Sequence, residues 1–427
     1  MSDEPRNTHQ GWISRLTNYS FLLLVVSLGL PQFPFPFFGL QVVVTDLVFL
    51  LTAGLWVPSV LFERRRIRWH PLYLALLAYL LALLVSAVFS IDRSTSFSRF
   101  PAEGYLICLA GLTFDIVDSE PALKRTILAW LAGTALAVLL GLATVGLFYL
   151  EPNSPFLEYL TYHYGSVPVG NYPRITAGFV SASMLCNYLN VGLILALLAL
   201  RKGWIPRMTA ILLVLAIAIA AAFTISIGLG GLALAVGIWI WLERDLSRPT
   251  RQLAFTLGCS ISLLFLVAAF IALATYPGAQ AFLTIPAIHL DLMPSARVLV
   301  WADALRTFLS HPITGVGVGM PVASVIFTNT DGSQSLLTDA HNSFLSVAAQ
   351  EGIVGLAAFA ALLVLIVRRL LKTVRNAPSL TILAAVGLAL ICSFVYQGLT
   401  GSYEDARHLW VLMGIFMAAD RVENQAD

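Results

Sequence analysis

Charged side chains are scarce in this sequence. Asp, Glu, Lys and Arg make up 11% of the 427 residues, whereas a soluble domain carries roughly 25%. Hydrophobic residues make up 58%, and many lie in runs of about 17 to 25, the length that crosses a hydrocarbon core of about 30 Å. This composition argues against a soluble domain and predicts an all-α polytopic membrane protein.

Cysteine is also rare, and the cysteines are isolated from one another. Each of the four falls inside an apolar run: Cys108, Cys186, Cys259 and Cys392. We therefore expect neither a disulfide framework nor a CxxC metal site. The formal net charge of +2 gives no reason to expect a nucleic-acid partner.

About twelve apolar stretches are long enough to be transmembrane helices. We expect them at residues 16–31, 41–62, 71–90, 102–117, 124–150, 179–200, 208–224, 227–242, 253–276, 343–367, 380–397 and 407–420. The first is followed by a proline-rich segment, 31–36, and not by a small-residue cleavage site, so we interpret it as a retained span. The chain then divides into residues 1–276 with spans one to nine, a polar segment 277–342, and residues 343–427 with spans ten to twelve.

Basic residues gather on one side of this arrangement. Examples are Arg64-Arg65-Arg66, Arg201-Lys202 and Arg368-Arg369, which all share the side of both termini. Loops rich in Lys and Arg are typical of the cytoplasmic side. We therefore predict cytoplasmic termini and place segment 277–342 on the opposite face.

The polar segment 277–342 has internal structure. Apolar residues at 298, 301/302, 305 and 308/309 have helical spacing and predict an amphipathic helix that begins after Pro294-Ser295 and ends at His311-Pro312. Such a helix would lie on the membrane surface or against the bundle. The run from Gly315 to Gly319 lacks the lysine and the strand–loop–helix setting of a phosphate loop, so we interpret it as a tight, bending connection.

Three arginines stand out on the lysine-poor face, Arg174, Arg297 and Arg306, and two of them have a position that suggests a role. Arg297 would lie in the first turn of the amphipathic helix, where a cation is unfavourable unless it and the helix N-terminus face a bound anion. Arg174 directly precedes span six. It is either a snorkelling arginine at a span end or a second anion-binding group.

Polar groups also stand at two membrane boundaries nearby. His341, with Asp339 and Asn342, precedes span ten, and is either a structural histidine or a functional group at the water–lipid boundary. Glu404 and Asp405 precede span twelve. They either support the arginines or are ordinary loop charges.

Three short motifs join these residues in a recognisable way. Arg297 to Trp301 is followed by His311-Pro312 and the Gly315 to Gly319 run, and His341-Asn342 is followed by Glu351-Gly352 and Gly355. Both segments resemble those of the bacterial O-antigen ligase and O-antigen polymerase superfamily. The segment from Arg174 to Phe179 is similar to the family's entry to a middle span, although Ser181-Ala182-Ser183 replaces the usual Asn-Pro type of continuation.

The resemblance implies a GT-C-like fold, with a large periplasmic loop between spans nine and ten. It implies glycosyl transfer at the periplasmic face of the bacterial inner membrane, in lipopolysaccharide biosynthesis. The donor would be a glycan on undecaprenyl diphosphate, and the acceptor a lipid A-core sugar hydroxyl in ligases or another lipid-linked repeat in polymerases. Ligases of this kind invert the anomeric centre and need neither a metal nor another cofactor. Membrane lipids, but no nucleic acid, would be further partners.

The chemistry of the residues fits that expectation. Arg174 and Arg297 are candidates to bind the diphosphate, because guanidinium groups match phosphate oxygens bidentately and stabilise a leaving group that gains negative charge. His341 is the candidate base or acceptor-orienting group. Asp339, Asn342, Glu404 and Asp405 are candidate supporting residues.

Two rival functions remain open from the sequence. The nearest is the polymerase of the same superfamily, which these motifs separate poorly from the ligase. The other is a secondary transporter, since Asp46 and Asp115 fall in or close to apolar spans. Against a transporter, the sequence lacks a convincing internal repeat, and its ionisable residues gather at one face.

Overall fold

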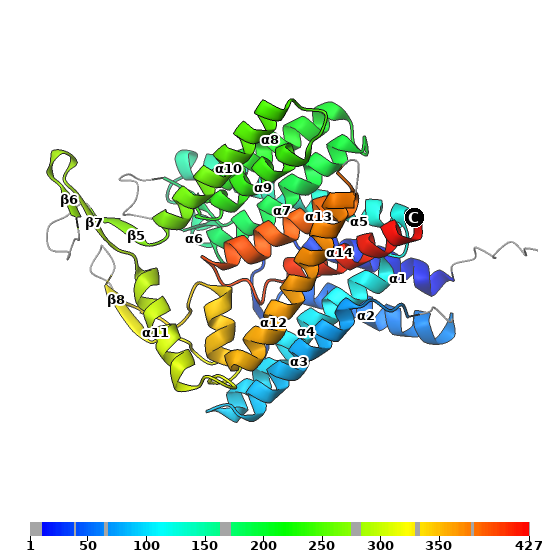
Figure 1. Cartoon of the computed structure of the whole chain (residues 1–427), viewed down its shortest axis with the longest axis horizontal. Coiled ribbons are helices and arrows are strands. Elements are labelled where there is room, and N and C mark those ends of the chain that lie inside the picture. The colour runs from blue at the N-terminus through cyan, green and yellow to red at the C-terminus, as the bar shows by residue number, and fades with distance from the viewer. Residues whose placement is uncertain are drawn as a thin grey trace, which may run out of the picture.

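The protein is mostly helical in the computed structural model, which describes residues 11–37, 40–63, 67–162, 172–274, 283–328, 334–376 and 380–426. The helices are α1 (Trp12–Ser27), α2 (Val44–Phe62), α3 (Leu72–Val88), α4 (Arg93–Ile116), α5 (Glu120–Leu150), α6 (Leu157–Leu160), α7 (Ala182–Arg201), α8 (Arg207–Phe223), α9 (Leu229–Leu242), α10 (Arg248–Ala268), α11 (Ala296–Ser310), α12 (Ser343–Asn376), α13 (Ile382–Leu390) and α14 (Arg407–Ala426). A 3₁₀ turn, η1 (Pro286–Ile288), and a π-helical stretch, η2 (Ile391–Tyr396), complete them. Figure 1 shows the long helices packed side by side, with β5 to β8 and α11 projecting at one side of the bundle.

Each predicted span overlaps one of these helices. Among the described residues, five helices are long and apolar enough to cross a membrane, namely α2, α5, α7, α10 and α12. The helices α3, α8 and α9, and α13 together with η2, are apolar but shorter. The number of crossings and their sidedness therefore stay predictions, while the mostly helical membrane architecture is supported.

Short antiparallel strands lie in the connections, which the all-α prediction did not include. They are β1 (Phe35–Phe37) with β2 (Leu40–Val42), β3 (Thr161–Tyr162) with β4 (Arg174–Ile175), β5 (Ile271–Ala274) and β6 (Leu283–Ile285) on either side of β7 (Leu290–Pro294), and β8 (Val325–Thr328) with β9 (Gln334–Leu337). The helix predicted to reach residue 276 ends at Ala268, and Ile271 pairs with Pro294 instead. The Ser295 hydroxyl donates to the Ala269 carbonyl at 2.7 Å and so satisfies the helix end.

The amphipathic helix of the polar segment is confirmed as α11. It begins after the N-cap residue Ser295 and ends at His311, as predicted. Its buried residues are Val300 and Ala304, whereas Leu305 and Leu309 are exposed. The predicted apolar stripe is therefore divided. Leu305 and Leu309 can face a membrane surface, whereas Trp301 packs edge-on against Phe270, with ring centroids 5.0 Å apart, and its Nε1 is buried.

Helix α12 is broken, and the glycine-rich run fills the break. Gly352 has φ 67° and ψ −162°, a conformation essentially restricted to glycine. The amides of Val316 and Gly317 donate to the carbonyls of Ala349 and Gln350, each at 2.9 Å. Ile353 and Val354, beyond the break, donate in turn to Pro312 and Ile313. The run is the tight connection that the sequence predicted, and its backbone satisfies the groups that the broken helix exposes.

Buried amides join helices inside the bundle. The side-chain amide of Asn187 donates to the Ser393 carbonyl at 2.7 Å, and its oxygen contacts Nε2 of His408 at 2.7 Å. The side-chain amide of Asn190 donates to the Gly228 carbonyl at 2.9 Å. These contacts link α7 with η2, α14 and the start of α9, so both asparagines serve helix association.

Candidate functional site

The turn between η2 and α14, residues 398–406, is tied to the start of α12. The Ser402 hydroxyl donates to Oδ1 of Asp339 at 2.6 Å. The Ser343 hydroxyl donates to the Gly401 carbonyl at 3.1 Å and accepts from the Tyr403 amide at 2.8 Å. These bonds bring Glu404 and Asp405 to the residues that precede α12, across about sixty positions of sequence. Sequence reasoning missed the roles of Ser343, Ser402 and Tyr403, because hydroxyl groups in a loop carry no distinctive spacing.

His341 and Asp339 form a pair at this junction. Nδ1 of His341 lies 2.7 Å from Oδ2 of Asp339, and both side chains are about half exposed. His341 has φ 49°, so its backbone is left-handed and turns the chain into α12. Burial on its own raises the pKa of Asp339, but hydrogen bonds from His341 and Ser402 outweigh it and hold that pKa below its usual value. Asp339 is therefore an ionised partner that orients the imidazole.

Asn342 has a structural role. Its side-chain oxygen accepts from the amides of Phe344 and Leu345 at 3.0 and 3.1 Å, which is N-cap geometry at the start of α12. Its side-chain nitrogen donates to the Leu399 carbonyl at 3.1 Å. Both ends of this amide are thus used to hold α12 and the 398–406 turn together.

Arg174 lies on β4, beside the C-terminus of α8. Its Nε donates to the Thr224 carbonyl at 2.9 Å, and a cation is favourable at that helix end. The neighbouring Gly178 has φ 76°, and a Cβ there would overlap Pro31 of the proline-rich segment. The proline-rich segment therefore packs against the chain four residues after Arg174.

The sequence after Arg174 departs from the family pattern, but the N-terminus of α7 is still capped by a side chain. The hydroxyl of Ser181 accepts from the Met184 amide at 3.1 Å and caps α7. Asn and Ser are interchangeable as N-cap residues. Ser181 can therefore do at this helix start what an asparagine does.

Tyr403 lies within electrostatic reach of both arginines. Its side chain is 3% exposed, and its hydroxyl donates to the Ser183 carbonyl at 3.2 Å. Burial raises the pKa of Tyr403, and the positive charges of Arg297 and Arg174 both oppose that rise. Arg297 comes from the first turn of α11 and Arg174 from β4, so the fold brings their charges to one neighbourhood around this tyrosine.

Glu404 and Asp405 differ in environment. Burial, together with the charge of Asp405, raises the pKa of Glu404 to about 8. Its Oε2 is buried and has no hydrogen-bond partner among the described residues. Asp405 is exposed. The expectation that these carboxylates support Arg174 and Arg297 stays a prediction.

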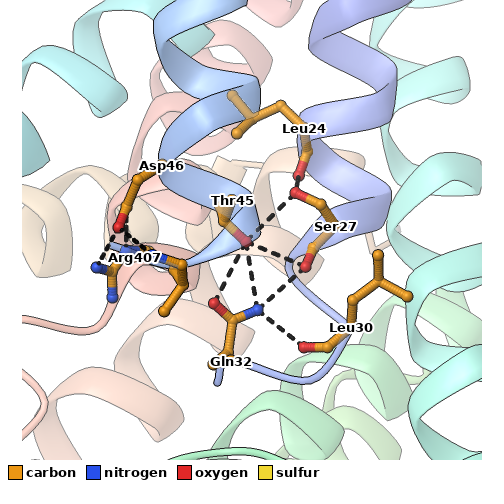
Figure 2. A network of polar contacts seen from close by, with 8 residues as sticks. Leu24, Ser27, Leu30, Gln32, Thr45, Asp46 and Arg407 are labelled. Atoms are coloured by element: carbon orange, nitrogen blue, oxygen red, sulfur yellow. Dashed lines mark hydrogen bonds and ion pairs between the residues drawn. The ribbon is translucent and has the colours of Figure 1, made fainter. Parts of the chain in front are cut away.

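A polar network ties α1, α2 and α14 together at the same end of the bundle. Figure 2 shows Asp46 and Arg407 in a two-pronged ion pair, with Nε–Oδ1 at 2.7 Å and a second contact at 3.0 Å. Beside it, the Gln32 amide donates to the carbonyls of Ser27 and Leu30 and contacts the Thr45 hydroxyl. Asp46 is thus a paired residue in the first turn of α2.

Asp115 is also at a helix end and has partners. It accepts from Nε1 of Trp56 at 2.8 Å and from the Arg68 amide at 3.2 Å. The two aspartates that kept the transporter alternative open are therefore structural groups at helix ends, not acidic groups at mid-membrane.

Among the described residues, no set of three or more His, Cys, Asp or Glu side chains could hold a metal ion. The cations that the described site offers are side chains.

Residues 208–360 match a family model described as O-antigen ligase. The matched segment runs from α8 into α12 and contains Arg297, Asp339 and His341, but neither Arg174 nor the 398–406 turn. A search of curated proteins found no match.

Proposed function

Since this chain is a member of the O-antigen ligase and polymerase superfamily, we propose that it is the ligase. In this proposal it is an inverting, metal-independent glycosyltransferase of GT-C type in the bacterial inner membrane. It moves a glycan from undecaprenyl diphosphate to a sugar hydroxyl of lipid A-core. The termini are cytoplasmic and the site is periplasmic. The observations that support the proposal are the electrostatic influence of both Arg174 and Arg297 on Tyr403 in the 398–406 turn, and the hydrogen bond that ties this turn to the Asp339–His341 pair.

The two arginines bind the donor diphosphate. Negative charge grows on the leaving phosphate as the anomeric C–O bond breaks, and preorganised cations stabilise it. Arg297 lies where the N-terminus of α11 adds its own positive end, and that turn contains no acidic residue. Arg174 is held in place by the Thr224 carbonyl. An arginine that is already held in place loses less conformational entropy when it binds a phosphate.

His341 accepts the proton of the acceptor hydroxyl. Its Nδ1 faces ionised Asp339, which favours a proton on Nδ1 and leaves Nε2 as the basic nitrogen. The half-exposed imidazole is accessible to a large glycolipid acceptor. Asp339 is a positioning residue here, since it acts through the histidine.

Transfer is a single displacement. The acceptor oxygen forms a bond to the anomeric carbon while the bond from that carbon to the phosphate oxygen breaks. The hydroxyl proton passes to Nε2 of His341, and undecaprenyl diphosphate leaves with the electron pair. Attack from the face opposite to the leaving group inverts the anomeric centre.

Reconstituted protein and defined substrates test the assignment. Purified protein would be supplied with an undecaprenyl-diphosphate glycan and, in separate reactions, with lipid A-core or with a second lipid-linked repeat. Product masses distinguish the outcomes. We expect glycosylated lipid A-core; elongation of the lipid-linked repeat without transfer to lipid A-core would contradict the ligase assignment and identify a polymerase.

A further inference from the structure

A basic cavity lies at the opposite end of the bundle from His341. Its volume is about 560 Å³, and it lies between the ends of α9 and α12 and the starts of α10 and α13. Four arginines line it, Arg244, Arg248, Arg251 and Arg375, together with apolar groups such as Trp241 and Leu380. The cavity thus combines cationic and apolar walls.

The helices separate this cavity from the site described above. Helix α10 begins at Arg248 and ends at Ala268, next to Ser295 and hence to the start of α11. Its 21 residues span about 30 Å, roughly the thickness of a hydrocarbon core. Helix α12 likewise has His341 before its start and Arg375 in its last turn. A ligand of the cavity therefore occupies the other membrane face from the His341 site.

The arginines of the cavity have no protein counter-charge in the described part of the chain. Two other arginines at this end are paired, Arg201 with Glu243 and Arg369 with Asp420. Among the described residues, none of the four cavity arginines has an ion pair or a side-chain hydrogen bond, and Nε of Arg251 is buried without a hydrogen-bond partner.

The helix start adds to this positive charge. Arg248 and Arg251 lie at the N-terminus of α10, and its first turn holds no acidic residue. Cations are unfavourable at the positive end of a helix. A bound anion would remove both the repulsion and the unsatisfied donor.

We propose that the cavity binds the phosphate headgroup of an anionic phospholipid. Arginine forks match phosphate oxygens, and basic pockets between helix ends are suited to lipid headgroups. A lipid is favoured over a soluble phosphate because apolar rings adjoin the arginines. Trp241 lines the cavity and contacts Phe255, which lies one turn beyond Arg251 on the same face of α10 and is 38% exposed. These rings offer a surface for an acyl chain next to the headgroup.

The test compares lipid retention by two doubly substituted proteins. The variant Arg248→Gln/Arg251→Gln removes two cavity charges, and Lys202→Gln/Arg207→Gln removes two exposed charges at the same end of the bundle, outside the cavity lining. Native mass spectrometry of the full chain released from micelles would measure retention of phosphatidylglycerol, with phosphatidylcholine and inorganic phosphate as comparison probes. A basic residue at an anionic lipid surface strengthens binding about five-fold, so the cavity variant should lose roughly 25-fold in phosphatidylglycerol affinity.

The outcomes separate the explanations. The proposal predicts that the control variant retains the lipid like wild type, and that phosphatidylcholine and inorganic phosphate bind far more weakly. Equal losses in both variants would show that the cavity is only part of a diffuse basic surface and would overturn the proposal. Competition by inorganic phosphate at the same concentration as the lipid would also overturn it, in favour of a soluble anion. Unchanged size-exclusion profiles and melting temperatures control for misfolding.

Discussion

Replacing Gly352 by alanine should disrupt the packing that supports the start of α12. Gly352 adopts a backbone conformation that alanine rarely adopts, and an added Cβ would overlap the backbone of Ile313 and Thr314. Backbone atoms cannot move aside as a flexible side chain can. The substitution must therefore push the 312–317 segment out of the helix break.

The cost follows from the contacts that would be lost. Backbone strain of this kind costs about 1 to 3 kcal/mol. Displacement of the segment also breaks at least the Val316–Ala349 and Gly317–Gln350 hydrogen bonds, each contributing about 1 kcal/mol. We expect the free energy of unfolding to fall by roughly 3 to 5 kcal/mol.

Equilibrium unfolding in mixed micelles would measure this loss, with Gly146→Ala as the matched control. Gly146 lies in α5, and a Cβ there meets no atom within 4 Å. Alanine should be neutral or slightly stabilising at that position. If the Gly352→Ala protein were as stable as the Gly146→Ala protein, close packing of segment 312–317 in the break of α12 would not contribute to stability as proposed.

Three further predictions concern charge. Asp46→Asn should lower the free energy of unfolding by roughly 1 to 3 kcal/mol, less than for a fully buried pair, because the Arg407 side chain is 32% exposed. In a double-mutant cycle, Asp46→Asn/Arg407→Gln should destabilise the protein by less than the sum of the two single substitutions. Strict additivity would show that the two residues are not coupled. The folded protein holds the Glu404 proton up to about pH 8, whereas the unfolded chain releases it near pH 4.5, so stability should decrease as pH rises between these values. Glu404→Gln should remove that part of the slope in unfolding curves measured at several pH values, and an unaltered slope would contradict the raised pKa. Glycan transfer should persist after dialysis against EDTA, because arginines are proposed to take the place of a divalent cation. If EDTA abolished transfer and added metal restored it, the proposed metal independence would be refuted.

The sequence predicted the helices well because their signals are strong and local. Long apolar runs define α2, α5, α7, α10 and α12, and helical spacing between Ser295 and His311 predicted both ends of α11. The glycine run was correctly interpreted as a bending connection. Its partner, the break in α12, was not foreseen, since one glycine in an apolar run gives no sign that the helix stops there.

The sequence predicted the charged residues of the candidate site but not the turn that packs against them. Arg174, Arg297 and His341 stood out because charge is rare on a lysine-poor face, and their family motifs drew attention to them. Tyr403 and Ser402 did not, because their roles depend on a turn that meets α12 only in the folded chain. Asn342 was a candidate supporting residue, and only the structure shows that its amide caps α12.

The measurement that tests the central claim most directly is the transfer rate of matched variants in the reconstituted reaction. Arg297→Ala and His341→Ala would be compared with Arg306→Ala, an exposed arginine of α11, and His289→Ala, an exposed histidine of the preceding strand region. Loss of a phosphate-stabilising cation or of a general base costs about 100-fold or more. We predict such losses for the first two variants and near wild-type rates for the controls. Wild-type rates in properly folded Arg297→Ala and His341→Ala proteins would contradict the proposed site.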